Sequence, residues 1–383
     1  MQVPLLDLTA QYQSIKPKID KAVIDVLNSQ KGILGPEVQR LEAEMARYLG
    51  AKHAVAVASG TDALLLSLMA IDTAPGDGII TTPFTFFATA GCIHRLGART
   101  FFVDIDETYN LSPTALEIFL SQECEQKSGH TFHRGTGCRI RALIPVHLYG
   151  QCADMTALSA TCKKWGLKII EDACQAILAS HDGKQAGRMG DFGCFSFFPS
   201  KNLGGLGDGG LITTPDDDAA KLLRILRVHG SEPKYYHRLV GINSRLDTLQ
   251  AAIILVKLDH LKEWTESRQR NASFYTKQFQ GNPHIAVPVC NPMNNHVFNQ
   301  YCIRVKERDR LRDHLTKHAV GSEIYYPVPL HLQECFRYLE YKKGDFPASE
   351  RASSEVLALP VYPELTEVQR KFVAETILSF YNA

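Results

Sequence analysis

The chain has 383 residues, of which 45% are hydrophobic and 22% charged, with a formal net charge of +1. This length predicts two domains of a globular protein, and the near-neutral charge argues against partners bound through bulk charge, such as nucleic acid or a membrane surface. The ten cysteines form no C-x-x-C pair, which favours reduced thiols in the cytoplasm over a zinc ribbon or a disulfide framework. We see no secretion signal and no apolar run long enough to span a bilayer.

Short apolar runs alternate with amphipathic stretches from about residue 51 to 214, at 54–58, 78–82, 100–103, 142–147, 168–171 and 194–197. This alternation predicts an α/β fold with a mainly parallel, doubly covered sheet. The polar, glycine-bearing residues 121–140 are expected to form an inserted surface loop.

Residues 244–279 predict one long helix, because apolar residues recur on one face with charges opposite. After it the pattern changes to a short strand at 300–305 and a helix at 309–318. We therefore expect a large domain at 1–255 and a smaller C-terminal α+β domain at 256–383, bridged by the long helix.

The first segment that carries chemistry, residues 55–64, indicates a strand, a tight turn and the start of a helix. Free N–H groups and the helix dipole at such a turn favour a phosphate. Gly60 permits close approach, and Thr61 adds a hydroxyl donor. The alternative is a plain N-cap by Ser59 or Thr61.

Aromatic residues follow the next strand, at 82–90. One aromatic ring at the carboxyl end of a strand can stack on a flat heterocycle, and we expect Phe86 to do so. The alternative is core packing, which must explain at least one of Phe84, Phe86 and Phe87.

Asp172 ends the apolar run at 168–171. A buried, unpaired carboxylate is costly. The protonated nitrogen of a bound heterocyclic ring opposite Asp172 would pair with it. The alternative is a helix cap for the following segment. Gln175 is expected either to bond an oxygen on the same ring or to face solvent.

Lys201 stands in a hydroxyl-bearing turn after the run at 194–197. Such a lysine can lose hydration and become an amine nucleophile, although a solvated surface lysine is the alternative. Ser196, five residues earlier, is a plausible phosphate donor. A Schiff-base lysine with a carboxylate for a pyridine nitrogen is what pyridoxal phosphate (PLP) requires of a protein.

Two further patterns do not indicate sites. The run at 205–210 matches G-x-G-x-x-G, but an apolar run at 211–214 follows it where a dinucleotide site needs a helix. We expect a glycine-rich turn that supports the lysine loop. His130 and His133 lie in the expected insertion with no carboxylate close by, so no metal is expected.

Together, these segments resemble the DegT/DnrJ/EryC1/StrS sugar aminotransferases, which are PLP enzymes of fold type I. The resemblance runs over nearly the whole chain, and its specificity comes from the order of the motifs. The motifs are SGT at 59–61, TPFTFFATA at 82–90, PVHLYGQ at 145–151, EDACQ at 171–175, SFFPSKN at 196–202 and GINSRLD at 241–247.

The resemblance implies a role for each matching position. Lys201 would form the Schiff base, Asp172 would pair with the pyridine nitrogen, and Gln175 would meet the phenolic oxygen. Phe86 would stack on the ring. The phosphate would be held by Gly60, Thr61 and Ser196, with Asn243 reaching it from the partner subunit of a homodimer. The residues near the sugar would be Arg245, Tyr326 and His331.

The implied reaction transfers an amino group from glutamate to a nucleotide-linked keto-sugar for amino-sugar and surface polysaccharide biosynthesis. The segment 228–250 looks most like the branch acting on UDP-2-acetamido-2-deoxy-3-keto-glucuronate. Arg245 suits a sugar carboxylate because a guanidinium binds it through two hydrogen bonds. The alternatives are a 4-keto-6-deoxy sugar on dTDP or GDP, and a PLP-fold binding or regulatory protein without turnover.

Overall fold

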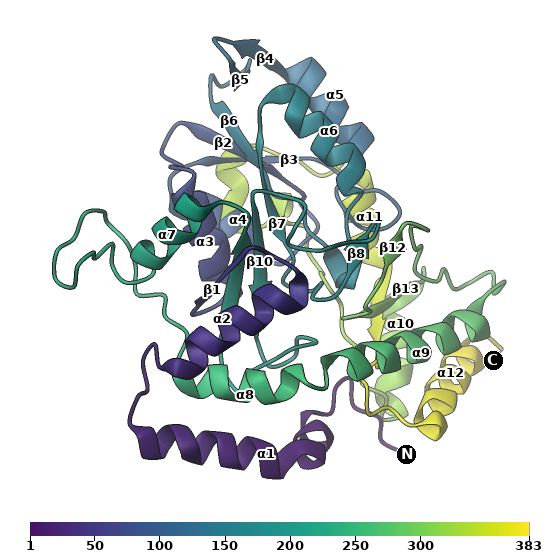
Figure 1. Cartoon of the computed structure of the whole chain (residues 1–383). Helices are drawn as coiled ribbons and strands as arrows, with labels where there is room; N and C mark the ends of the chain where they lie inside the picture. The colour runs from purple at the N-terminus through teal and green to yellow at the C-terminus, as the bar shows by residue number, and fades with distance from the viewer. Residues whose placement is uncertain (383) are drawn as a thin grey trace.

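A nine-stranded sheet forms the centre of the protein in a computed structural model that describes residues 1–382 (Figure 1). Seven strands follow the order β1-β11-β10-β7-β6-β2-β3, and β4 and β5 extend from β6. Neighbours from β10 to β3 pair in parallel, whereas β11 is antiparallel to both its neighbours. The strands are β1 (His53–Val57), β2 (Asp77–Thr81), β3 (Arg99–Phe102), β4 (Cys124–Lys127), β5 (His130–His133), β6 (Arg139–Leu143), β7 (Lys168–Asp172), β10 (Phe192–Ser196) and β11 (Gly210–Thr214).

Helices cover both faces of this sheet, which confirms the predicted doubly covered α/β fold. Adjacent strand residues such as Leu211 and Ile212 belong to different apolar clusters, because successive side chains point to opposite faces. One face packs against α3 (Gly60–Ala70), α4 (Ala88–Arg95) and α7 (Asp217–Leu226). The other face packs against α2 (Pro36–Leu49), α5 (Pro113–Glu123), α6 (Met155–Trp165) and α8 (Thr248–Leu258).

The prediction of a surface loop at 121–140 was wrong. These residues form the antiparallel hairpin β4–β5, and β5 continues the sheet by pairing with β6. Ser128 and Gly129 turn the hairpin with φ angles of 52° and 76°, as a tight two-residue hairpin turn requires. Three of the four β4 residues are exposed and their side chains are polar, so the segment lacks the apolar run by which the other strands were predicted.

The single long helix predicted over 244–279 is two helices, α8 and α9 (Leu261–Phe279), with a break at Asp259 and His260. Neither glycine nor proline marks the break. The helices pack into different cores: Ile254 of α8 lies in the cluster beneath the sheet, and Tyr275 of α9 lies in the C-terminal cluster. The change of direction lets each helix bury its own apolar face, which periodicity within one segment does not reveal.

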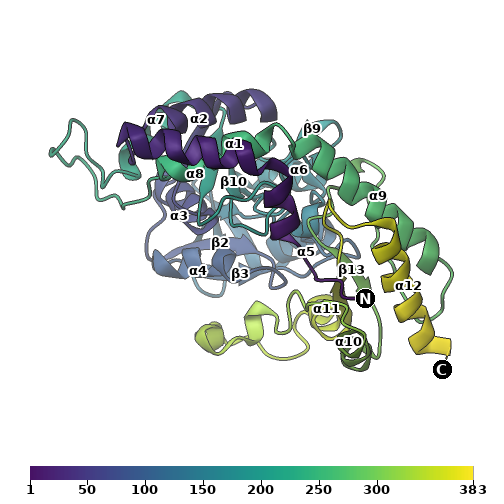
Figure 2. The same ribbon diagram turned by 90° about the horizontal axis from the view of Figure 1, so that it is seen from below.

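The C-terminal part packs around a two-stranded antiparallel sheet of β13 (Tyr301–Arg304) and β14 (Val356–Leu359). Figure 2 shows α9 beside α12 (Glu367–Asn382), with α10 (Arg308–Lys317) and α11 (Pro347–Glu355) nearby. A small sheet of β8 (Ser180–His181), β9 (Lys184–Gln185) and β12 (Asn294–Asn295) adjoins α9 through the hydrogen bond from Gln269 to Asn295. Helix α1 (Leu8–Ser29) lies along α8. Among residues 1–382, no helix has both the length and the apolar character to cross a membrane. The domain boundary at residue 256 stays a prediction.

Candidate active site

Four strands bring the candidate site together at one edge of the sheet. The segments carrying Gly60, Phe86 and Asp172 follow or end β1, β2 and β7, and β10 leads into the turn that carries Lys201. These four strands run in the same direction. Open α/β sheets bind ligands outside the carboxyl ends of their strands, so this edge is where a site is expected.

Lys201 lies in the turn after β10, where its backbone N–H donates to Phe198 O at 2.9 Å. The side chain is only partly exposed, so it is not a freely solvated surface lysine. Burial lowers the pKa of its amine, and the nearby Cys174 and Asp172 oppose that shift. A lower pKa leaves more of the amine neutral, the form that acts as nucleophile or base.

Asp172 is buried, with 6% of its surface exposed. Its Oδ2 accepts a hydrogen bond from Thr89 Oγ1 at 2.8 Å, and its Oδ1 accepts one from Cys174 N at 3.2 Å. The segment after β7 forms turns and not a helix, so the helix-cap alternative is wrong. Thr89 was not singled out from the sequence, although the segment 82–90 contains it.

Gln175 and Tyr326, distant in sequence, meet in the structure. Gln175 Oε1 accepts from Tyr149 N at 2.7 Å, and its Nε2 donates to the Tyr326 hydroxyl at 3.0 Å. Gln175 is only 7% exposed, so the solvent-facing alternative is wrong. Burial raises the pKa of the Tyr326 hydroxyl, which keeps that hydroxyl protonated.

The three aromatic residues after β2 differ in burial and in the rings they contact. Phe84 is fully buried in the core, and Phe87 stacks on Phe336 with ring centroids 5.5 Å apart. Phe86 is 56% exposed, and its ring lies 6.2 Å from that of Tyr326. Both line a cavity of about 360 Å³ formed by residues 85–87, 323–328, 330 and 333. Phe87 is 47% exposed and also lines this cavity, but its ring is already stacked on Phe336. Phe86 is therefore the better placed of the three to meet a flat ligand.

The first turn of α3 forms another part of the site. Ser59 caps this helix by accepting a hydrogen bond from Asp62 N at 3.0 Å, whereas Thr61 is exposed. A Cβ on Gly60 would lie 2.8 Å from both Cys174 Sγ and Ser196 Cβ. Only glycine therefore lets this helix start lie against Ser196. The cap by Ser59 and an anion at the same helix start are compatible.

The remaining three predicted residues belong to other segments. The exposed Asn243 and partly buried Arg245 flank Ser244, whose Oγ accepts from Ala58 N at 3.2 Å. Among the described residues, Arg245 Nε is buried without a hydrogen-bond partner. His331 does not line the cavity at Phe86. It is buried, with Nε2 3.1 Å from Glu350 Oε1.

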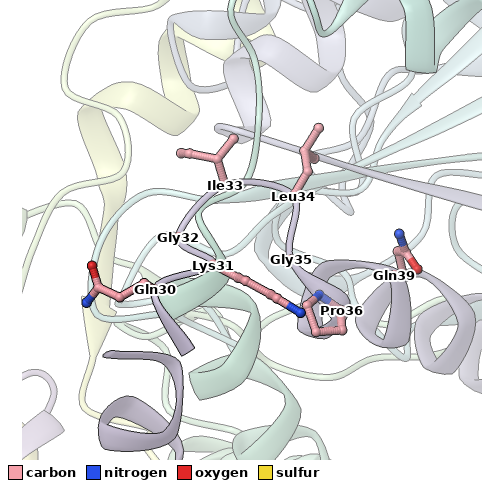
Figure 3. A pocket seen from close by; sticks show the side chains of 8 residues that line it. All are labelled: Gln30, Lys31, Gly32, Ile33, Leu34, Gly35, Pro36 and Gln39. Carbon is pink, nitrogen blue, oxygen red and sulfur yellow. The ribbon is translucent and has the colours of Figure 1, made fainter. Parts of the chain in front are cut away.

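A second hollow of about 490 Å³ lies between α1 and α2 (Figure 3). Its loop is tied to the segment after Arg245, because Gly35 N donates to Thr248 Oγ1 at 3.0 Å and Thr248 N donates to Gly32 O at 3.0 Å. Figure 3 shows the Lys31 side chain running toward Pro36, away from Ile33 and Leu34. The chemistry-bearing residues above do not line it.

The arrangement suits a flat cofactor with a phosphate group. Phe86 offers an exposed ring, Asp172 a buried carboxylate, and Lys201 an amine of lowered pKa. The start of α3 offers the backbone dipole that favours an anion, and Gly60 leaves space that a Cβ would fill.

The fold and site define the class: a fold type I PLP-dependent aminotransferase, with a large mixed α/β sheet and a lysine and carboxylate at its edge. The sequence profile of the DegT/DnrJ/EryC1/StrS aminotransferase family matches residues 13–378. The chain therefore belongs to the DegT/DnrJ/EryC1/StrS aminotransferase family.

Three relatives illustrate the range of this family. A protein of Geobacillus stearothermophilus named "Pleiotropic regulatory protein" is 46% identical, with 100% of this chain and 99% of the relative covered. The UDP-2-acetamido-2-deoxy-3-oxo-D-glucuronate aminotransferase of Pseudomonas aeruginosa is 39% identical, covering 98% and 99%. A dTDP-3-amino-3,4,6-trideoxy-alpha-D-glucose transaminase of Streptomyces venezuelae is 38% identical, covering 98% and 95%.

Two solved structures extend the comparison. DesV of S. venezuelae, in complex with a ketimine intermediate, has a TM-score of 0.93 and 37% identity, covering 100% of this chain and 99% of that one. NtdA of Bacillus subtilis, with bound cofactor PMP, has a TM-score of 0.88 and 28% identity, covering 100% and 86%. The family and these structures imply a pyridoxal phosphate cofactor.

Proposed function

We propose that this aminotransferase uses PLP to move an amino group from glutamate to a nucleotide-linked keto-sugar, UDP-2-acetamido-2-deoxy-3-keto-glucuronate. The observation that carries the chemistry is the Lys201 amine, with a pKa lowered by burial, at the sheet edge that also holds Asp172. The test of the whole proposal is a panel of UDP-, dTDP- and GDP-linked keto-sugars offered to the purified protein with glutamate.

The site residues divide between the two ends of the cofactor. Asp172 would hold the pyridine nitrogen, Phe86 would stack on the ring, and Gln175 would meet the phenolic oxygen. Gly60, Thr61 and Ser196 would hold the phosphate. When bound, PLP supplies an aldehyde that condenses with amines and a ring that accepts an electron pair.

Lys201 is both the attachment point and the proton carrier. When not attached to the cofactor, its Nζ would take the proton from the Cα of glutamate and deliver it to the cofactor. This requires a neutral amine, which its lowered pKa favours. Asp172 keeps its orientation through the hydrogen bonds from Thr89 and Cys174 N, so its carboxylate stays directed at the site.

The sugar specificity rests on Arg245. Its Nε is buried without a hydrogen-bond partner among the described residues, and a carboxylate supplies the paired oxygens that a guanidinium binds. The UDP-uronate and dTDP-sugar relatives are 39% and 38% identical, so overall similarity does not choose between them. Tyr326 lies at the cavity beside Phe86. His331 directly follows Leu330, which lines this cavity, and is itself buried against Glu350.

Truncating Arg245 to alanine is expected to raise the Michaelis constant for the uronate far more than it slows the half-reaction with glutamate. A carboxylate that loses its charge-assisted contacts loses about 1–3 kcal/mol. Steady-state kinetics with the uronate and single-turnover kinetics with glutamate measure the two effects. Arg245→Lys keeps the charge but loses the paired geometry, so we expect an intermediate value.

Neutral 6-deoxy-keto-sugars provide the control for this prediction. If the enzyme uses them as well as the uronate, and Arg245→Ala harms both equally, the carboxylate assignment fails. The assignment as an aminotransferase stands under that result, because the half-reaction with glutamate does not involve the sugar.

A homodimer with shared sites is the second element of the proposal. The segment between α7 and α8 projects from the body in Figure 1 and exposes four large apolar side chains. Their exposed fractions are 79% for Tyr235, 70% for Tyr236, 45% for Leu239 and 91% for Val240. Clustered exposed apolar groups mark interaction surfaces. Asn243 and Arg245 follow on the same segment, so a partner covering it would receive both residues in its own site, with Asn243 at the phosphate and Arg245 near the sugar.

Mixing two inactive variants tests this arrangement. Lys201→Ala and Asn243→Ala subunits are expected to regain activity as heterodimers, because one hybrid site then has both residues intact. An isologous dimer contains two such sites, so activity cannot exceed about half that of the unsubstituted protein. Differently tagged subunits and tandem affinity purification isolate the heterodimers for assay.

The matched control mixes Lys201→Ala with Asp172→Ala. Both residues belong to one chain's site, so neither hybrid site is complete and no rescue is expected. Verified heterodimers of Lys201→Ala and Asn243→Ala that stay inactive would show that each site belongs to one chain.

The cytoplasm is the proposed location. All ten cysteines are free thiols, and six of them are buried. Burial raises the pKa of several, among them Cys92, Cys124 and Cys162, to about 12, so these thiols stay protonated. Free thiols in this number fit a reducing compartment.

A further inference from the structure

The glycine-rich run at 204–210 packs directly against the turn that carries Lys201. Gly205 N donates to Phe197 O at 2.7 Å. A Cβ on Gly204 would lie 2.4 Å from Pro199 O and 2.8 Å from Phe198 O. No side chain therefore fits between this run and the turn, and a shift of Gly204 would move the backbone just before Lys201.

Two polar side chains of helix α8 form hydrogen bonds to the backbone of this run. Gln250 Oε1 accepts a hydrogen bond from Leu206 N at 2.9 Å, and Lys257 Nζ donates one to Gly204 O at 2.8 Å. Gln250 and Lys257 are seven residues apart, which is about two helical turns, so they lie on one face. Figure 1 shows α8 passing below the ends of β1 and β10, where the turn begins.

Lys257 is an unusual residue for this position. It is only 4% exposed, and burial lowers the pKa of its amine to about 8, against the opposing charge of Glu364. Burying an amine is unfavourable unless it makes a hydrogen bond, and a methionine of similar length would fill the space without that penalty. The bond to Gly204 O is what the amine adds.

We propose that Gln250 and Lys257 are positioning residues. By tethering the backbone of Gly204 and Leu206 to α8, they fix the position of the turn that carries Lys201. They act through the backbone and do not contact the reacting atoms. The inference rests on the proposed function in one respect, that Lys201 carries the chemistry. The tether itself can be tested without cofactor or substrate.

The experiment compares two matched pairs and one control. Gln250→Leu removes the acceptor for Leu206 N, whereas Gln250→Glu keeps it. Lys257→Met removes the donor, whereas Lys257→Arg keeps one. Lys262→Met alters an exposed lysine at the start of α9 and serves as the control. Each protein is studied by hydrogen exchange of the apoprotein, and by single-turnover reaction with glutamate after loading with PLP.

We expect amides in peptides covering 197–210 to exchange faster in Gln250→Leu and Lys257→Met, and to be unchanged in Lys262→Met. In Gln250→Leu and in Lys257→Met the single-turnover rate should fall about threefold to tenfold, the size expected for losing one hydrogen bond. The concentration of glutamate giving half the maximal rate should stay the same. Gln250→Glu and Lys257→Arg should recover most of the rate, which a general loss of fold stability would not produce.

Unchanged exchange in both Gln250→Leu and Lys257→Met would overturn the tether. Faster exchange with an unchanged single-turnover rate would overturn the positioning role. If Lys257→Met does not fold, the Gln250 pair decides the question alone. Failure of the unsubstituted protein to react with glutamate would instead overturn the proposed function, and it would be seen before any substitution is made.

Discussion

Lys201→Ala is expected to abolish transamination and the absorbance of the Schiff base between protein and cofactor, because it removes the amine that attaches the cofactor. Activity should fall below detection in both half-reactions, even where PLP still binds through the phosphate residues. Absorption spectra with and without glutamate measure the first effect, and product formation measures the second. Lys201→Arg is the matched variant, since it keeps a positive charge but supplies no neutral amine at ordinary pH.

Borohydride reduction followed by peptide mapping locates the attachment site directly. A pyridoxyl group on any other lysine would contradict the assignment of Lys201. The apoprotein gives a second measurement, by competitive labelling of amines across pH. Burial lowers the pKa of Lys201, so its reactivity should rise at a lower pH than that of exposed lysines, whose pKa is about 10.4.

Asp172→Ala is expected to retain some PLP but to lose most of its turnover. Without the carboxylate, the pyridine nitrogen no longer stays protonated and the ring is a weaker electron acceptor. Loss of a charge-assisted hydrogen bond typically costs about 1.5–3 kcal/mol, which corresponds to about tenfold to 150-fold in rate. The electron-acceptor role should add to that loss. Single-turnover kinetics with glutamate measure it.

Asp172→Asn is the matched variant, because it keeps the shape and removes the charge. The negative charge of Asp172 raises the pKa of Lys201, so its removal should lower that pKa further in the labelling experiment. This shift is independent of turnover. Near-normal turnover in Asp172→Ala would give this residue a purely structural role, in which it holds Thr89 and the turn at Cys174 through its two hydrogen bonds.

Much of the fold follows from local patterns. The apolar runs predicted around β1, β2, β3, β6, β7 and β10 are strands in the structure, because a strand buried on both faces must be apolar along its length. The glycine run after Lys201 leads into strand β11, as its sequence context indicated. The hairpin β4–β5 was missed because it extends the sheet through polar residues.

The class of protein follows from the sequence: the order of the motifs identified the family and placed Asp172 at the end of a strand and Lys201 in the turn after one. Tertiary structure alone decided which side chains meet. It joined Gln175 to Tyr326 across 151 positions, turned Phe86 outward while burying Phe84, and placed Lys257 beneath Gly204. The physical reason is that spacing within a segment fixes which residues share a face, whereas contacts between segments depend on how separate helices and strands pack around a common core.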